Sequence, residues 1–113
     1  MRSSTPRVAR AAAGPTLSVQ YVLEMNETFA PGDFVVNIDY LGGGYGVVGD
    51  LEREAIHLAA RCEGLLLDPV YTGRAMGGLI DMVRRRVVAP QETVLFWHTG
   101  GLPSVFAYAD ALA

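Results

Sequence analysis

The fold of this chain is decided around two stretches, LDPVYTGRAM at residues 67–76 and WHTGG at residues 97–101. Each follows an apolar run, turns at a glycine and continues into a segment whose apolar residues recur at helical spacing. In α/β proteins, loops of this kind follow the carboxyl ends of parallel strands, where ligands bind. We therefore expect the two stretches to meet at one site.

The surrounding sequence alternates between strand and helix patterns. Runs of β-branched, aromatic or wholly apolar residues predict strands over 34–40, 65–67 and 93–98. Helical periodicity and capping residues predict helices over 51–63, over about 73–86 and from about 102 onward. This βαβαβα order predicts an α/β fold in which the three strands form a parallel sheet.

The pattern also predicts which faces of the first two helices are buried. Asp50 is the expected N-cap of the first helix, and Thr72 that of the second. The expected buried residues of the first helix are Leu51, Ala55, Leu58, Ala59 and Cys62. Those of the second helix are Met76, Leu79, Ile80 and Val83. Gly77 and Gly78 each cost ~1 kcal/mol relative to alanine inside a helix, so we expect a strand or a cofactor to pack closely against them.

Size and composition exclude several classes of protein. A chain of 113 residues is long enough for one small domain, and its net charge of −3 gives no basic surplus for binding nucleic acid. No apolar run approaches the ~20 residues of a membrane span. The single cysteine, Cys62, excludes an internal disulfide and a cysteine-based metal site, so we expect no metal and a cytoplasmic location.

A dinucleotide site is one alternative. GYGVVG, residues 44–49, matches the pattern G-x-G-x-x-G, and Asp68 follows the next strand as a ribose-binding acid would. Against this alternative, the capping signal at Asp50 places the helix start after the motif. A carboxylate there would also repel a pyrophosphate.

Three motifs together resemble a known enzyme family. GGYG at residues 43–46, DPVYTGRAM at 68–76 and WHTGG at 97–101 are similar to the D-cysteine desulfhydrases and 1-aminocyclopropane-1-carboxylate deaminases. Such enzymes use pyridoxal 5'-phosphate (PLP) and have the tryptophan synthase β-like fold, PLP fold type II. The resemblance implies that residues 34–113 are the C-terminal part of the large domain, whereas residues 1–33 match poorly.

The resemblance also implies roles for four residues. Tyr45 would reach the substrate side of the cofactor in a hydrogen-bonding or acid/base role, and Tyr71 would face the pyridine ring. Thr72 follows Tyr71 in the cofactor-binding stretch, and the hydroxyl of Thr99 would lie at the pyridine nitrogen. Taken singly, each residue also suits a loop or a helix cap. The case rests on the two long stretches that match in order.

The implied activity is a lyase or deaminase reaction on a small amino acid. Thr72 and Thr99 are typical of the desulfhydrase branch, which favours D-cysteine as substrate, giving pyruvate, ammonia and sulfide. The alternative is 1-aminocyclopropane-1-carboxylate deaminase, whose branch has glutamate and leucine at these positions. The resemblance also implies that a full-length enzyme would form a homodimer.

One absence limits the activity of this chain. All nine basic side chains are arginines, so the chain has no lysine, and PLP enzymes bind their cofactor covalently through a lysine amine. We therefore expect a fragment that is inactive by itself, from a partial gene model, a split gene or a decayed copy. An alternative to a part of an active enzyme is that the gene encodes a truncated, non-catalytic protein. Residues 1–33, which hold Arg2, Arg7 and Arg10, suggest a leader or a misassigned start.

Overall fold

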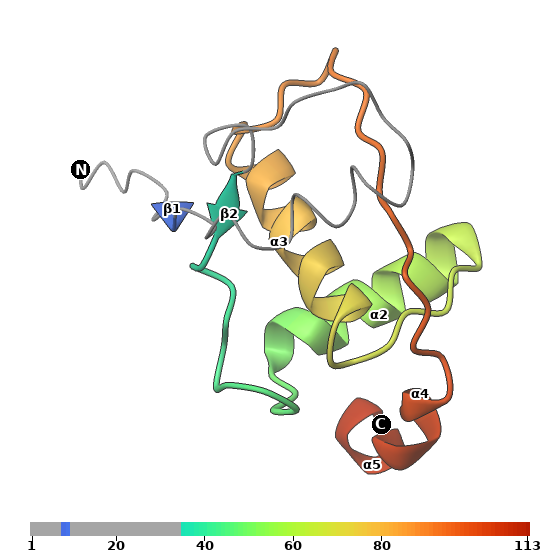
Figure 1. Ribbon diagram of the computed structural model, residues 1–113. Helices are drawn as coiled ribbons and strands as arrows, with labels where there is room; N and C mark the ends of the chain where they lie inside the picture. Colours follow the sequence, from blue (N-terminus) through green and yellow to red (C-terminus); the bar gives the residue numbers. More distant parts are fainter. Residues whose placement is uncertain (1–7, 10–34) are drawn as a thin grey trace, which may run out of the picture. The chain divides into compact units, whose positions relative to one another are not determined.

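The computed structural model describes residues 8–9 and 35–113, in two units that cover residues 1–39 and 40–113 (Figure 1). In the first unit, strand β1 (Val8–Ala9) pairs antiparallel with strand β2 (Val36–Asn37). The strand predicted over 34–40 is thus confirmed only at its centre. The leader predicted over residues 1–33 lies outside the described residues, apart from the two in β1.

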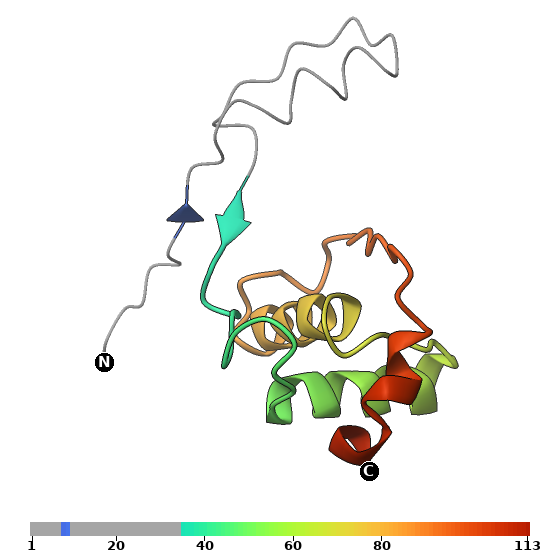
Figure 2. The ribbon, with the colours of Figure 1, turned by 60° about the horizontal axis from the view of Figure 1, so that its bottom comes forward.

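The second unit is built on two packed helices, α2 (Asp50–Glu63) and α3 (Thr72–Arg84). Two short helices, α4 (Ser104–Ala107) and α5 (Ala109–Leu112), follow in place of the single last helix that the sequence predicts. They lie beside α2 in both ribbon views (Figures 1 and 2). The core between these elements is formed by Ile56, Ala59, Leu67 and Leu112. No helix in the described part of the chain is long and apolar enough to cross a membrane.

The N-cap of helix α2 is Gly49, one residue before the expected cap Asp50. The backbone N–H of Gly49 donates to Glu52 Oε2 at 2.9 Å, so Glu52 satisfies the helix start. Asp50 is the first helical residue and pairs with Arg53 at the surface. The predicted stop at Gly64 is confirmed, because this residue takes the left-handed conformation with φ 67°.

The buried stripe of α2 is rotated from the prediction. Ala55 and Ala59 are buried as expected, but Leu58 and Cys62 are exposed, and Leu51 is only half-buried. Glu52 and Ile56 are buried in their place. The stripe of Glu52, Ala55, Ile56 and Ala59 follows i, i+3, i+4 spacing. This stripe faces the start of α3. The sequence pattern alone did not show that α3 is the packing partner.

The glycines inside α3 pack against a helix and a ring, not a strand or a cofactor. A Cβ added at Gly77 would collide with the side chain of Leu51 in α2. One added at Gly78 would lie 3.0 Å from the ring of Tyr40. The prediction of close packing was therefore right, and the predicted partners were wrong. Met76, Leu79 and Ile80 are half-buried as an inner face, whereas Val83 is exposed.

The segments 65–67 and 93–98 carry no strand assignment. The only strands among the described residues are the two antiparallel ones of the first unit. A strand is defined by the ladder bonds of a neighbour, and neither segment has such a neighbour in the described part of the chain. The parallel α/β sheet stays a prediction.

Candidate functional site

Asp68 builds the start of α3. Its Oδ2 accepts hydrogen bonds from the backbone N–H groups of Val70 and Tyr71, both at 2.8 Å. Its Oδ1 accepts from the N–H of Thr72 at 2.7 Å and from the Thr72 hydroxyl at 2.6 Å. The Asp68 residue is 1% exposed. One buried carboxylate therefore satisfies the N–H groups that open the helix.

These bonds keep Asp68 charged despite its burial. Burial raises the pKa of the carboxyl, but the hydroxyl of Thr72 and the three backbone N–H groups outweigh burial and hold the pKa below its ordinary value. The negative charge also suits the positive end of the helix dipole. Asp68 is thus a structural anion, and no oxygen of it is left to bind the ribose of a dinucleotide.

Thr72 is part of the same cap. Its hydroxyl donates to Asp68 Oδ1 and accepts from the Asp68 N–H at 2.8 Å, and the residue is buried. The predicted cofactor contact of Thr72 stays a prediction. It would require this hydroxyl to give up one of two short hydrogen bonds, so the structure favours the capping role.

A buried ion pair joins α3 to α2, and its arginine also binds the glycine loop, residues 41–49. Arg74 Nε donates to Glu52 Oε1 at 2.6 Å, while its Nη1 and Nη2 donate to the carbonyls of Gly44 and Val47 at 3.0 and 2.8 Å. Burial raises the pKa of Glu52, but the bonds from Arg74 and the Gly49 N–H outweigh it and lower the pKa. The three-way contact fixes the loop against both helices.

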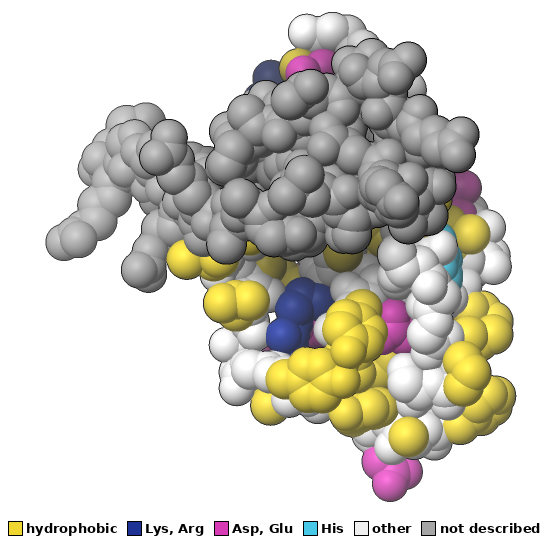
Figure 3. All heavy atoms as spheres, viewed as in Figure 1, with side chains coloured by type: hydrophobic (Ala, Val, Ile, Leu, Met, Phe, Trp, Pro, Cys, Tyr) yellow, Lys and Arg dark blue, Asp and Glu magenta, His cyan; other side chains and the backbone are white. Residues whose placement is uncertain are grey.

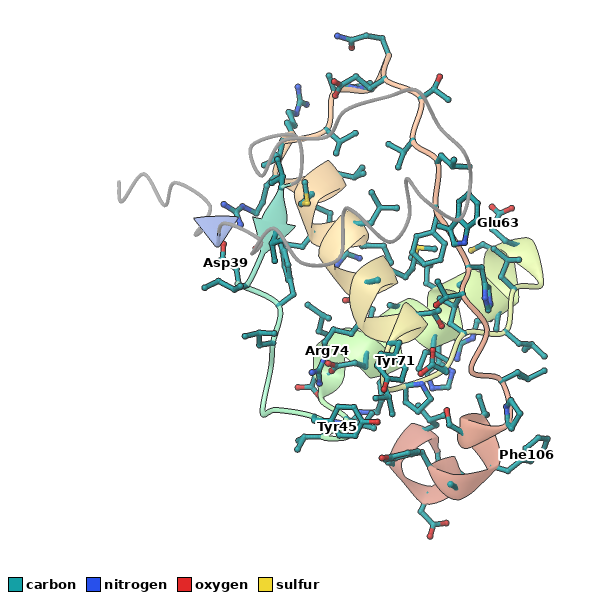
Figure 4. The ribbon with its side chains drawn as sticks, viewed as in Figure 1. Asp39, Tyr45, Glu63, Tyr71, Arg74 and Phe106 are labelled. Carbon is teal, nitrogen blue, oxygen red and sulfur yellow. The ribbon has the colours of Figure 1, made fainter. Side chains whose placement is uncertain are left out.

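Tyr45 lies at the tip of this loop and meets Tyr71. The two hydroxyls are 2.9 Å apart, and the rings meet edge to face with centroids 5.9 Å apart. Gly44 and Gly46, with φ 114° and 72°, allow the turn on either side of Tyr45. Figure 4 shows Tyr45, Tyr71 and Arg74 together at the start of α3. The structure therefore brings together two of the predicted site residues.

The tyrosine pair is open to solvent. Tyr45 is 80% exposed and Tyr71 58%. Hydrophobic side chains, tyrosine included, and basic ones lie side by side at the surface over the start of α3 (Figure 3). The hydrogen bond with Tyr45 raises the pKa of the Tyr71 phenol above its ordinary value of 10.0. Near neutral pH Tyr71 therefore keeps its proton and can donate it.

The second stretch, residues 97–101, lies against the first. His98 Nδ1 accepts from the N–H of Gly100 at 3.0 Å, so its Nε2 carries the proton and donates to the carbonyl of Leu66, also at 3.0 Å. A Cβ added at Gly101 would lie 2.6 Å from Asp68 Cγ. The expectation that the two stretches meet is confirmed. Thr99 is exposed, and its hydroxyl has no hydrogen-bond partner among the described residues.

The sequence did not predict the roles that three residues of the site hold: Asp68, Glu52 and Arg74. Asp68 carried a capping signal, because an aspartate shortly before a helix is a common N-cap. Glu52 and Arg74 gave no local signal, since they are 22 residues apart and meet only through the packing of two helices. His57 is half-buried, with Nε2 2.9 Å from the Leu112 carbonyl. Among the described residues no three His, Cys, Asp or Glu side chains gather to hold a metal ion.

Comparison with known proteins supports the resemblance. No protein-family model matches the sequence. Over 89 residues, 79% of its length, the chain is 46% identical to a 1-aminocyclopropane-1-carboxylate deaminase of Burkholderia vietnamiensis. The chain spans about a quarter, 26%, of that protein. The likeness supports the family of 1-aminocyclopropane-1-carboxylate deaminases and D-cysteine desulfhydrases, and with it an enzymatic relationship.

Proposed function

We propose that this chain is the C-terminal segment of a PLP-dependent lyase or deaminase that acts on a small amino acid. The observation that carries the proposal is the paired hydroxyls of Tyr45 and Tyr71, 2.9 Å apart on an open face. They come from two of the motifs that are similar to the family. The 46% identity to a named deaminase supports the same reading. A homodimer of the full-length enzyme belongs to this proposal.

The residues of the chain fit part of a PLP site. The exposed Tyr71 ring offers an apolar face for a pyridine ring, and the Thr99 hydroxyl is free of protein partners in the described part of the chain. Thr72 fits less well, because both sides of its hydroxyl are engaged by Asp68. The lysine amine has no counterpart in this chain and would have to come from elsewhere in the enzyme.

The tyrosine pair defines what this segment can contribute. When bound, PLP supplies an electron sink for a carbanion. The Tyr45 and Tyr71 hydroxyls would hold a proton at the substrate side, and their mutual hydrogen bond orients both. Because its pKa lies above 10.0, Tyr71 acts as a donor near neutral pH.

Two substrates compete within this proposal. 1-Aminocyclopropane-1-carboxylate is supported by the name of the relative. D-Cysteine is supported by the threonines at 72 and 99, since a neutral hydroxyl at the pyridine nitrogen activates less than an acid would, and loss of a thiol needs less activation than ring opening. The buried cap position of Thr72 weakens that support, because position 72 is where the deaminase branch has its acid, and here its hydroxyl is engaged by Asp68.

The test is to replace the matching segment of the Burkholderia deaminase with residues 34–113 of this chain. Release of ammonia from 1-aminocyclopropane-1-carboxylate or from D-cysteine, lost in the Tyr45→Phe/Tyr71→Phe chimera, is the expected result. Sulfide release separates the substrates, and Thr72→Glu/Thr99→Leu should shift the preference toward the cyclopropane. A folded, PLP-loaded chimera that is inert toward both compounds would overturn the proposal.

The isolated chain gives a second test. Because it has no lysine, borohydride treatment with PLP should label nothing but the terminal amine of Met1. Mass mapping checks the site of labelling, and a sulfide assay with D-cysteine checks turnover. An adduct within residues 34–113, or sulfide above the blank, would contradict the role assigned to the missing lysine.

A further inference from the structure

The loop that carries Tyr45 depends on one side chain of α3. Residues 41–47 are mostly exposed. Besides two turn bonds, Gly44 N to Leu41 O and Val47 N to Gly44 O, and the contact of the Tyr45 hydroxyl with Tyr71, the loop is bound through its backbone carbonyls by Arg74. The guanidinium binds the carbonyls of Gly44 and Val47, which flank Tyr45 on both sides. The position of the tyrosine therefore depends on where this guanidinium is held.

Glu52 holds the guanidinium in turn. Its Oε1 accepts from Arg74 Nε, and its Oε2 accepts from the Gly49 N–H at the end of the same loop. In this ion pair the Glu52 side chain is 3% exposed and that of Arg74 13%. One carboxylate thus fixes both the arginine and the end of the loop.

We propose that Arg74, fixed by Glu52, is the positioning residue that places the Tyr45 hydroxyl against Tyr71. This role rests on the proposed function, in which the two hydroxyls face the substrate. It adds a residue that touches neither substrate nor cofactor. A planar fork of fixed donors suits three acceptors in three directions, which a lysine ammonium on a flexible stem cannot reproduce.

The geometry argues against a direct role of Arg74 in substrate binding. Its Nε, Nη1 and Nη2 each donate to an oxygen of the protein. A Cβ added at Gly42 would lie 3.3 Å from Nη2, so the loop also covers the guanidinium. A substrate carboxylate could reach it only by displacing the loop that carries Tyr45.

The test follows the tyrosine contact on the full 113-residue chain, without cofactor or substrate. Tyrosine ring carbons are labelled with ¹³C, the Tyr71 signal is assigned with Tyr71→Phe, and its titration is recorded by NMR. Tyr45→Phe gives the reference value without the contact. Arg74→Lys and Arg74→Gln are compared with Arg84→Gln, which removes an exposed arginine and its pair with Glu54 from the same helix.

We expect the pKa of Tyr71 to fall toward its ordinary value in Tyr45→Phe and equally in Arg74→Gln. In Arg74→Lys the pKa of Tyr71 should fall only part of the way, and in Arg84→Gln it should not change. In the double variant Tyr45→Phe/Arg74→Gln it should equal the value in either single variant. Loss of a nearby positive charge alone would raise a phenol pKa, so the sign separates positioning from electrostatics. Circular dichroism confirms that each variant is folded. If Arg74→Gln destroys the fold, Arg74→Lys decides by the same criterion.

An unchanged or raised Tyr71 pKa in a folded Arg74 variant would overturn the positioning role. In the chimera, Arg74→Lys should lower kcat up to about a hundredfold with little change in KM, because a displaced group costs the transition state more than substrate binding. If the titration succeeds and the chimera is inert, the positioning role stands and the proposed function fails.

Discussion

The start of α3 was expected to follow one strand of a sheet and the segment 93–98 to form another, yet the two regions differ sharply. At the start of α3, Asp68 is 1% exposed, and its carboxylate oxygens have four donors. In the other segment, Leu95 is 82% and Trp97 76% exposed. His98 ties that segment to the Leu66 carbonyl, and Gly101 packs beside Asp68. Phe96 is half-buried against the core, whereas Leu95 and Trp97 contribute little burial.

The difference teaches which interactions a short chain can complete by itself. A helix start closes its hydrogen bonds with a side chain a few residues away, so residues 68–74 need only local sequence and one neighbouring helix. A sheet strand needs a second strand on at least one side, and its apolar side chains need a layer to cover them. Substitutions at the start of α3, the completed region, should therefore cost more stability than substitutions in the exposed segment 93–98.

Asp68→Ala should give the largest loss of stability. It removes the acceptor of three backbone N–H groups and of the buried Thr72 hydroxyl, which we expect to cost about 2–4 kcal/mol. Urea unfolding followed by circular dichroism measures the loss. Asp50→Ala, which removes an exposed aspartate from the start of α2, is the matched control and should cost less than about 0.5 kcal/mol. Equal losses in the two variants would contradict the role assigned to Asp68.

Gly77→Ala should come next. Alanine favours the helix by ~1 kcal/mol, but its Cβ would collide with Leu51. We expect a net loss of about 1–2 kcal/mol from overpacking. In a Leu51→Ala background, the same change should become neutral or stabilising. A gain in the Leu51 parent would show that the two helices are less closely packed than described.

Acid should weaken the completed region selectively. Both Asp68 and Glu52 have folded pKa values below the ordinary 3.8 and 4.5. Their contribution is therefore fully present at pH 7 and is lost as the pH falls through the folded values, below about pH 4. Asp68→Asn and Glu52→Gln should flatten the fall in unfolding free energy between pH 5 and pH 3. If the double variant loses unfolding free energy with falling pH as steeply as the wild type, these two carboxyls are not the source of the acid sensitivity.

Trp97→Ser and Leu95→Ser should give the smallest change. Both side chains are largely exposed, so we expect less than about 0.5 kcal/mol in the isolated chain. Exposed apolar side chains favour association, so the isolated chain should be poorly soluble or oligomeric, and both variants should reduce this in sedimentation experiments. A loss above 2 kcal/mol for Trp97→Ser would instead show that the segment packs within the monomer.

Several features of the fold were readable from local sequence. The stop of α2 at Gly64 followed from glycine chemistry, and capping chemistry located the start of α3 to within one residue, since Thr72 is its first helical residue and Tyr71 its N-cap. The proximity of residues 67–76 and 97–101 followed from their motifs, and the contact of Gly101 with Asp68 confirms it. The buried face of α2 was misplaced, since helical spacing leaves the angle of the stripe open until a packing partner is known.

The sequence by itself determined the helices, the stretches that form the site and the absence of a lysine, because these depend on residue type and on contacts within a few positions. Only the tertiary structure decided that Gly77 receives Leu51, that Glu52 binds Arg74, and that Arg74 holds the loop of Tyr45 against Tyr71. The physical reason is distance along the chain. These partners lie 22 to 30 residues apart, and nothing in either segment marks the other until two helices pack and exclude water between them.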